Sequence, residues 1–189
     1  MPTDLVPQPS PEWRAAQHRI RNDLQTLAAL LRLSRRRAPD SALVEQYPDW
    51  LSVLAALYDA LPLWEGSEEI ALEGIARALL ARGRFASPLF LEGGEDATIA
   101  VQSALAAALC LHGLFTFSCR SAAPGGTVRV SLTADLEALR AETAFPSSGG
   151  APAGWPPLSL SLASEALDGR YSVDTAGEET VAVLLIPRR

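Results

Sequence analysis

Residues 13–33 read WRAAQHRIRNDLQTLAALLRL, and this stretch decides the fold of the N-terminal part of the chain. Apolar side chains recur there at spacings of three and four, the period of an amphipathic helix: Trp13, Ala16, Ile20, Leu24, Leu27 and Leu31. Leu30 and Leu33 widen this stripe, which indicates that more than one neighbouring helix packs against it. We therefore expect a helix from Glu12 to Arg37, ending in three arginines that suit the negative end of the helix dipole.

A second helix is expected from about Ser41 to Leu61, after a stop at Ala38-Pro39-Asp40. Pro48 falls inside this segment and predicts a separate opening turn, with the main helix beginning at Asp49. The two helices would form an antiparallel hairpin whose apolar surface is too broad for one copy to bury. Two hairpins paired in a four-helix bundle would bury it, so we predict a homodimer.

The chain beyond residue 68 has a mixed helix and strand pattern. The expected helices are Glu68 to Arg82, Thr98 to His112 and Leu158 to Leu167. The expected strands are Pro88 to Glu92, Leu114 to Ser121, Thr127 to Leu132, Leu136 to Ala144, Arg170 to Val173 and Thr180 to Ile186, with a loop from Pro146 to Pro157. The predicted class is α+β, with helices covering one face of a mixed sheet. The predicted division is a disordered lead-in at 1–11, a helical hairpin at 12–63 and an α/β domain at 64–189.

Composition excludes several classes of function. The 189 residues carry a formal net charge of −6, which argues against nucleic acid as the main partner. All 16 basic residues are arginine, so no lysine can serve a phosphate loop or act as a catalytic base. The two histidines, His18 and His112, lack ligand spacing, and we expect no metal site. Cys110 and Cys119 read as free thiols of a cytoplasmic protein. Charged residues interrupt the apolar stretches, and no membrane span is expected.

His18 lies away from the apolar stripe of the first helix, beside Arg14, Arg21 and Asn22 at spacings of three and four. Nearby arginines disfavour the charged imidazolium, which keeps a ring-nitrogen lone pair available as a nucleophile. The same guanidiniums could neutralise the oxygens of a transferred phosphoryl group. From composition alone, an ordinary surface histidine is the stronger interpretation of this cluster.

The complete sequence of residues 18–25 favours a functional role for His18 over an ordinary surface histidine. His18-Arg19-Ile20-Arg21-Asn22-Asp23-Leu24-Gln25 resembles the phosphoacceptor helix of a histidine-kinase subfamily, which reads H-R-(V/I)-K-N-N-L-Q before an apolar tail. The departures are Arg21 for lysine and Asp23 for the second asparagine. The resemblance implies a dimerisation and histidine-phosphotransfer hairpin in which His18 is the phosphoacceptor, supported by Arg14, Arg21 and Asn22.

The order of elements in the α/β part resembles the ATP-binding domain of these kinases, but the nucleotide motifs differ. The family's N-box reads roughly N-E-x-x-x-N-A-x-K-H, and only His112 matches it here. Ser103, Ala104 and Ala108 replace the two asparagines and the acid, and no aspartate stands near Ala144, where the adenine-binding motif should follow. The resemblance therefore implies a degenerate ATPase-like domain with no cofactor-binding residues and no tight ATP binding.

These features resemble dimeric histidine phosphotransferases of phosphorelays. The expected partners are response-regulator receiver domains, which would also bring the Mg²⁺, and neither nucleic acid nor membrane is expected to bind. Two alternatives stay open. One is a non-catalytic pseudo-histidine-kinase scaffold that binds receivers or kinases, and the other, which is weaker, is a divergent active histidine kinase. His112, at the end of a buried helix, is expected to be structural.

Overall fold

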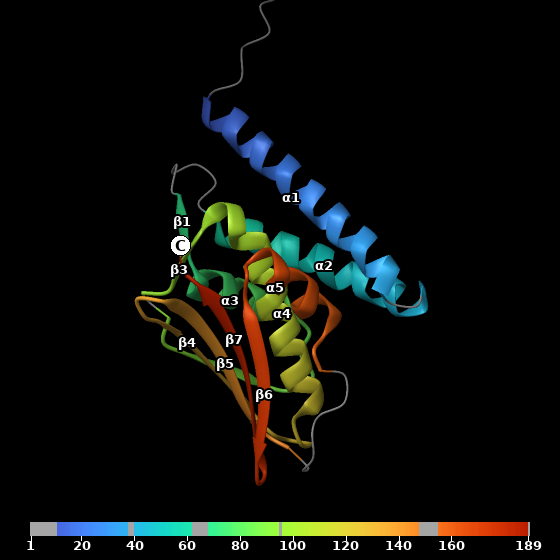
Figure 1. Ribbon diagram of the computed structural model, residues 1–189, viewed down its shortest axis with the longest axis vertical. Coiled ribbons are helices and arrows are strands. Elements are labelled where there is room, and N and C mark those ends of the chain that lie inside the picture. The colour runs from blue at the N-terminus through green and yellow to red at the C-terminus, as the bar shows by residue number, and fades with distance from the viewer. Residues whose placement is uncertain (1–10, 38–39, 62–67, 95, 148–154, 189) are drawn as a thin grey trace, which may run out of the picture.

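A computed structural model describes residues 11–37, 40–61, 68–94, 96–147 and 155–188 (Figure 1). The predicted disordered lead-in lies outside the described residues, except for Pro11, which begins the first helix. The ends of the predicted loop from Pro146 to Pro157 are described, whereas residues 148–154 are not. Residues 62–67, which the sequence suggests form a short connector, also lie outside the described residues.

Two long helices form the N-terminal part, as predicted: α1 (Pro11–Arg37) and α2 (Asp40–Ala60). The expected break at Pro48 is wrong, because α2 continues through this proline. The carbonyl of Pro48 still accepts a hydrogen bond of 2.9 Å from the Ser52 hydroxyl, four residues later. A proline removes only its own N–H from the helix ladder, and packing of the following turns can offset that loss.

The hairpin does not stand apart from the rest of the chain. In Figure 1, α2 lies directly over α3 and α4, and α1 crosses above it. Trp50, Val53, Ala56 and Leu57 of α2 are buried in the common core. Much of the apolar surface that we expected to be covered by a second hairpin is therefore covered within one copy. Large apolar side chains that stay exposed on the two helices are Leu24, Leu33 and Leu51.

The α/β part is one five-stranded mixed sheet with helices on one face (Figure 1). The strand order is β2-β4-β5-β7-β6; β2 runs parallel to β4 and the other pairs are antiparallel. A small antiparallel pair, β1 with β3, lies outside this sheet. The elements are β1 (Glu69–Ala71), α3 (Leu72–Arg82), β2 (Leu89–Glu92), β3 (Thr98–Ala100), η1 (Val101–Ser103), α4 (Ala104–Ser121), β4 (Val128–Ala134), β5 (Ala138–Pro146), α5 (Leu158–Ala166), β6 (Arg170–Ala176) and β7 (Glu179–Pro187). This architecture confirms the predicted α+β class.

Helix α4 differs more from the sequence-based prediction than any other element in the described part of the chain. The predicted strand from Leu114 to Ser121 is wrong, because α4 continues from Ala104 to Ser121 without a break. The predicted start of this helix, Thr98 to Ser103, is instead β3 and a 3₁₀ turn. Similarly, residues 69–71 of the helix expected from Glu68 form β1. Short strands of this kind are fixed by their pairing partner, which local sequence patterns do not reveal.

Alpha-helix α4 is the centre of the core. Most of its side chains are buried, and Leu109, Cys110 and Phe115 have no exposed surface. The segment Val101–Ser121 is long and apolar enough to cross a membrane by length and composition, so the prediction that charges interrupt every such stretch is wrong here. Most of this segment is buried inside the fold, as in the core helix of a globular domain. Cys110 and Cys119 are both free, as predicted.

The buried face of the sheet follows the alternation expected for a half-covered sheet. Val128, Val130 and Leu132 of β4 point into the core, whereas Arg129 on the same strand is exposed. The loop before α5 is held by aromatic packing, since the Trp155 ring lies 4.6 Å from that of Phe117. Trp155 is therefore a packing residue at the edge of the core.

Candidate functional site

His18 lies on an exposed face of α1, in the turn that follows buried Ala16. The helix forms here because the apolar stripe packs inward through Ala16, Leu27 and Leu30. This packing turns the string that begins at His18 outward, apart from Asp23. The sequence prediction that His18 is accessible on a helix face agrees with this placement.

Asn22 is the residue that contacts the His18 ring. Its Nδ2 atom lies 3.2 Å from His18 Nδ1, across one turn of α1. The oxygen and nitrogen of an asparagine amide can exchange places by rotation. Asn22 can therefore donate a hydrogen bond to Nδ1 or accept one from it. In either case Nδ1 is engaged, and no side chain in the described part of the chain bonds Nε2. The Nε2 atom is therefore the ring nitrogen open to an incoming group.

Arg14 and Arg21 are exposed on α1, as predicted. They are placed near His18 by helical spacing only, because no hydrogen bond among the described residues joins either guanidinium to the imidazole. Arg19 is half-buried, and its charge acts on Asp23. Of the predicted supporting residues, Asn22 thus contacts the His18 ring. Arg14 and Arg21 lie about one helical turn from His18 and do not contact the ring.

A buried polar contact that the sequence analysis missed lies behind this face. The Tyr58 hydroxyl on α2 donates a hydrogen bond of 2.9 Å to Oδ2 of Asp23 on α1. Burial raises the pKa of Asp23, while the Tyr58 hydrogen bond and Arg19 oppose that shift. The signal was available, because Asp23 continues the spacing of Ala16, Leu27 and Leu30, and a carboxylate in an apolar stripe needs a partner.

Four of the positions that correspond to the nucleotide motifs carry small side chains. Ala104 and Ala108 have no exposed surface, and their methyl groups offer no ligand to magnesium and no donor to a phosphate. Ser103 and Ala144 are half-buried. Within the described residues, no group of three or more His, Cys, Asp or Glu side chains could hold a metal ion.

Helix α5 packs closely on α4 at Cys110 and Gly113, on the two turns that follow Ala108. A Cβ atom added to Gly113 would lie 2.7 Å from the Ser159 hydroxyl oxygen and 3.1 Å from the Leu160 nitrogen. One turn earlier, the Cys110 Sγ lies 4.0 Å from the Leu160 carbonyl oxygen. The α4–α5 interface at these residues is thus filled by protein atoms.

Residues 16–83 match the histidine kinase family (HisKA_2), a segment that contains α1, α2 and α3. A comparison with curated protein sequences found no match. The family match begins two residues before His18, so the string that suggested a phosphoacceptor helix lies inside it.

Solved structures show the same fold over most of the chain. The histidine kinase domain of the blue-light activated histidine kinase EL346 from Erythrobacter litoralis has a TM-score of 0.62 and 20% identity, with 91% of each chain covered. A longer structure of the same kinase has a TM-score of 0.68 and 18% identity; the match covers 95% of the present chain and 61% of that protein. The nucleotide-free catalytic domain of histidine kinase ThkA has a TM-score of 0.51 and 14% identity, covering 63% and 93%. Residues 16–83 are thus similar to the histidine kinase family, and the chain shares the fold of histidine kinase domains.

Proposed function

We propose that the protein is a histidine phosphotransferase, in which His18 carries a phosphoryl group between the aspartates of receiver domains. It would not phosphorylate itself from ATP. The observation that supports this most directly is the exposed imidazole, whose Nδ1 is engaged by Asn22 while Nε2 has no partner among the described side chains. A nucleophile held in one orientation on a rigid helix is suited to in-line phosphoryl transfer.

The proposed step conserves atoms and charge. The lone pair of His18 Nε2 attacks the phosphorus of an aspartyl phosphate on the receiver, and the bond from phosphorus to the aspartate oxygen breaks. The aspartate leaves as a carboxylate, and His18 retains its proton on Nδ1, which can donate a hydrogen bond to the Asn22 amide oxygen. The second transfer, to another receiver, reverses these events. Mg²⁺ would be held by the receiver.

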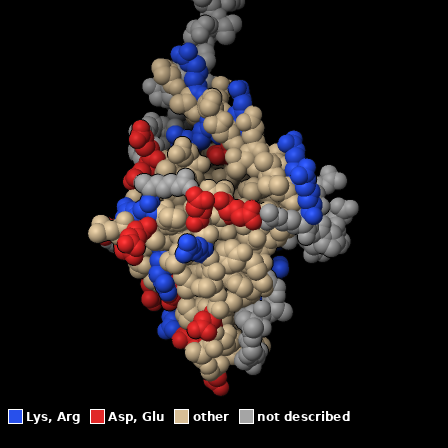
Figure 2. All heavy atoms as spheres, in the orientation of Figure 1, with Lys and Arg blue, Asp and Glu red and all other residues tan. Residues whose placement is uncertain are grey.

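The basic character of α1 favours an acidic partner surface. Basic side chains follow α1 across the upper part of the molecule in Figure 2, and exposed ones include Arg14, Arg21 and Arg32. Arg14 and Arg21 would contact phosphoryl oxygens during transfer, when negative charge lies near His18. Such steering also raises the rate at which oppositely charged proteins meet.

We infer that ATP is not the phosphoryl donor. The residues that match the N-box do not fit a nucleotide, because Ala104 and Ala108 are buried methyl groups rather than exposed polar ligands. Packing of α5 against Gly113 gives a further reason to expect no nucleotide cleft on the α5 side of α4. A phosphotransferase needs no such site, which makes the degenerate ATPase-like domain compatible with His18 chemistry.

A homodimer remains part of the proposal, since histidine-kinase-like proteins typically dimerise and act with response regulators. The side of α1 beside His18 has a groove with an apolar floor, lined by Gln17, Ile20, Arg21, Leu24, Gln25 and Ala28. Leu24 is 49% exposed in a single copy. A second hairpin seated on this groove would bury Leu24 and complete a four-helix bundle. We also propose a cytoplasmic location and a hairpin (12–63) distinct in function from the α/β domain (64–189).

The direct test is phosphoryl transfer from purified, phosphorylated receiver domains in the presence of Mg²⁺. We expect mass spectrometry to find phosphohistidine at residue 18 in the original protein and none in His18→Gln. His112→Gln is the matched control, because it removes the other histidine and should keep the label. Each variant is first checked for helix content by circular dichroism.

Two results would contradict the proposal. Transfer that persists in His18→Gln would show that another group carries the phosphoryl. Labelling of His18 from ATP in the absence of a receiver would favour a divergent kinase. If no receiver labels the protein, the scaffold alternative replaces phosphotransfer.

A further inference from the structure

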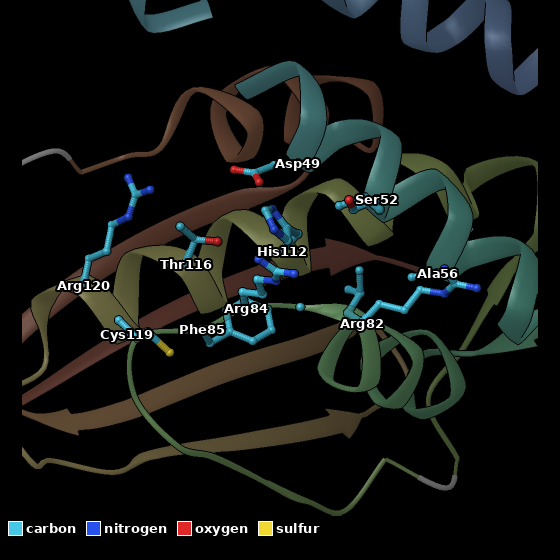
Figure 3. Close-up of a pocket in the computed structure, with 14 residues that line it drawn as sticks. Asp49, Ser52, Ala56, Arg82, Arg84, Phe85, His112, Thr116, Cys119 and Arg120 are labelled. Carbon is cyan, nitrogen blue, oxygen red and sulfur yellow. The ribbon is translucent and has the colours of Figure 1, made fainter. Parts of the chain in front are cut away.

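A second candidate site lies where α2 meets the α/β part of the chain. It is a cleft of about 460 Å³ between α2, residues 82–86 and the C-terminal half of α4 (Figure 3). Small-molecule sites in proteins usually have volumes of about 300–1,000 Å³. His18 does not line this cleft, and neither do Ser103, Ala104, Ala108 and Ala144. His112, the one residue that matches the N-box, is the only position of the nucleotide motifs in the described lining.

Positive charge dominates the lining. Three arginines, Arg82, Arg84 and Arg120, face one carboxylate, Asp49. Arg82 is already paired with Asp59, which lies outside the lining. Within the described part of the chain, neither Arg84 nor Arg120 forms an ion pair with a carboxylate. Two guanidiniums at one cleft can together hold a carboxylate or phosphate group.

His112 lies in the middle of this cleft, on α4. Burial lowers its pKa; the nearby Asp49 carboxylate opposes this shift and the Arg120 guanidinium adds to it. The ring packs against Phe85, with 6.0 Å between the ring centroids. A neutral imidazole can donate or accept a hydrogen bond without repelling a cation or an anion. Figure 3 shows Arg120 rising from α4 on one side of Thr116 and His112, and Arg82 extending along α2 on the other.

Apolar side chains complete the walls of the cleft. Val53 and Ala56 come from α2, Leu79 from α3 and Phe85 from the connection between α3 and β2. Lining of this kind favours a ligand with an apolar body as well as a charge, because an inorganic ion would leave these groups in contact with water.

We propose that this cleft binds a small organic anion, in which an apolar body is joined to one phosphate or carboxylate group. Arg84 and Arg120 hold the charged group, and Phe85, Leu79 and Val53 cover the body. The occupant touches α2, which belongs to the hairpin that carries His18, as well as α4. The binding itself does not depend on the proposed phosphotransfer, so each can fail without the other.

The test uses four probes of defined chemistry on the complete chain. Phenyl phosphate and benzoate carry a ring and an anionic group; benzyl alcohol lacks the charge, and inorganic phosphate lacks the body. Binding is followed by the NMR signals of the His112 ring, which are simple to assign because the sequence has two histidines. We expect phenyl phosphate or benzoate, or both, to shift these signals in a saturable way, and the stronger of the two identifies the anionic group.

The variants Arg84→Gln and Arg120→Gln should each weaken binding of the better probe by about tenfold, the loss expected for one charge-assisted hydrogen bond. Arg170→Gln removes an exposed arginine on β6, outside the cleft, and should leave binding unchanged. Hydrogen exchange should also slow in α2 when the better probe is bound.

Three results would overturn the proposal: no saturable shift with either ring-bearing anion, equal affinity for benzyl alcohol, or binding that both arginine variants retain in full. Inorganic phosphate that binds as tightly as phenyl phosphate would also overturn it, because the apolar walls would then contribute nothing. Arg84 and Arg120 are exposed, so their variants should fold, and circular dichroism checks this directly.

Discussion

Tyr58 on α2 donates a hydrogen bond to Asp23 on α1, and this bond joins the two helices of the hairpin one residue beyond Asn22. Asn22 in turn contacts the His18 ring. The bond therefore fixes the rotation of α1 against α2 in the turn next to the proposed phosphoacceptor, His18. It is a buried polar contact in an otherwise apolar stripe of α1.

Removing the hydroxyl should destabilise the protein. Tyr58→Phe leaves the Asp23 carboxylate buried without its donor, and we expect the free energy of unfolding to fall by about 1–3 kcal/mol at pH 7. Urea denaturation followed by circular dichroism measures this change. An unchanged midpoint would show that water replaces the hydroxyl at no cost.

Asp23→Asn should act in the opposite direction at neutral pH. Because burial raises the pKa of Asp23 above its ordinary value of 3.8, the folded protein holds this proton more tightly than the unfolded chain. The contribution to stability is therefore fully present below the unfolded pKa and is lost as the pH rises through the folded pKa. An asparagine can still accept the Tyr58 bond and carries no charge. We expect Asp23→Asn to be the more stable protein at pH 7, without the loss of stability that the carboxyl group causes as the pH rises above its ordinary pKa of 3.8. A variant that is less stable at pH 7 would contradict this expectation.

Asn22 should matter for rate rather than for docking. Asn22→Ala frees the His18 ring to rotate, so we expect transfer from a phosphorylated receiver to slow by about tenfold at saturating receiver concentration. Thr26→Ala, at an exposed position four residues further along α1 and outside the apolar groove, is the control and should transfer at the original rate. Equal transfer rates for the two variants would show that Asn22 has no role in the transfer.

Self-association should depend on the apolar groove of α1. Leu24→Arg places a charge on that surface, and we expect sedimentation to show a monomer where the original protein is a dimer. Leu136 is 97% exposed in the turn between β4 and β5, so Leu136→Arg is a charge-matched control that should sediment as the original does. A Leu24→Arg protein that remains dimeric would place the interface elsewhere.

Alanine substitutions at two helical glycines distinguish the effect of helix propensity on stability from the effect of helix packing. An added Cβ at Gly113 meets α5, including a backbone atom, so Gly113→Ala should cost about 1–3 kcal/mol. At Gly74, within α3, an added Cβ has nothing within 4 Å, and Gly74→Ala should instead stabilise by about 0.5–1 kcal/mol. Urea denaturation of both variants is the measurement, and stabilisation by both would mean that the α4–α5 contact is loose.

The two thiols should be unreactive in the folded protein. Burial raises the pKa of both Cys110 and Cys119, and a backbone hydrogen bond with Ser87 only partly opposes the rise at Cys119. We expect iodoacetamide at pH 8 to label neither thiol until urea unfolds the chain, as followed by intact mass. Rapid labelling of the folded protein would show that α4 opens locally.

The sequence was most informative where a long helical period repeats. It predicted α1 and the exposure of His18, because helical spacing alone separates the stripe through Leu27 from the face of Asn22. It failed at residues 114–121, where aromatic and apolar side chains suit a strand or a buried helix equally. Burial on nearly all sides of α4 removes the alternation that would distinguish the two.

Other features depend on distant partners. The strands β1 and β3 exist through pairing across about thirty residues, such as Ile70 with Ile99. The bond between Asp23 and Tyr58 depends on how α2 crosses α1, and sequence spacing carries no information about that crossing. The cleft around His112 likewise needs three elements at once.

The apolar character of α4 also bears on how the protein is made. Its earlier partners, α2 and α3, precede it along the chain, but β5, α5 and β7 are all synthesised later. At ~5–20 residues per second, a ribosome needs roughly 3 to 13 s to proceed from Ser121 to Pro187. During that interval one side of a helix apolar enough to enter a bilayer has no sheet to cover it. The nascent chain therefore passes through a stage in which chaperones and membranes compete for the segment that later becomes its core.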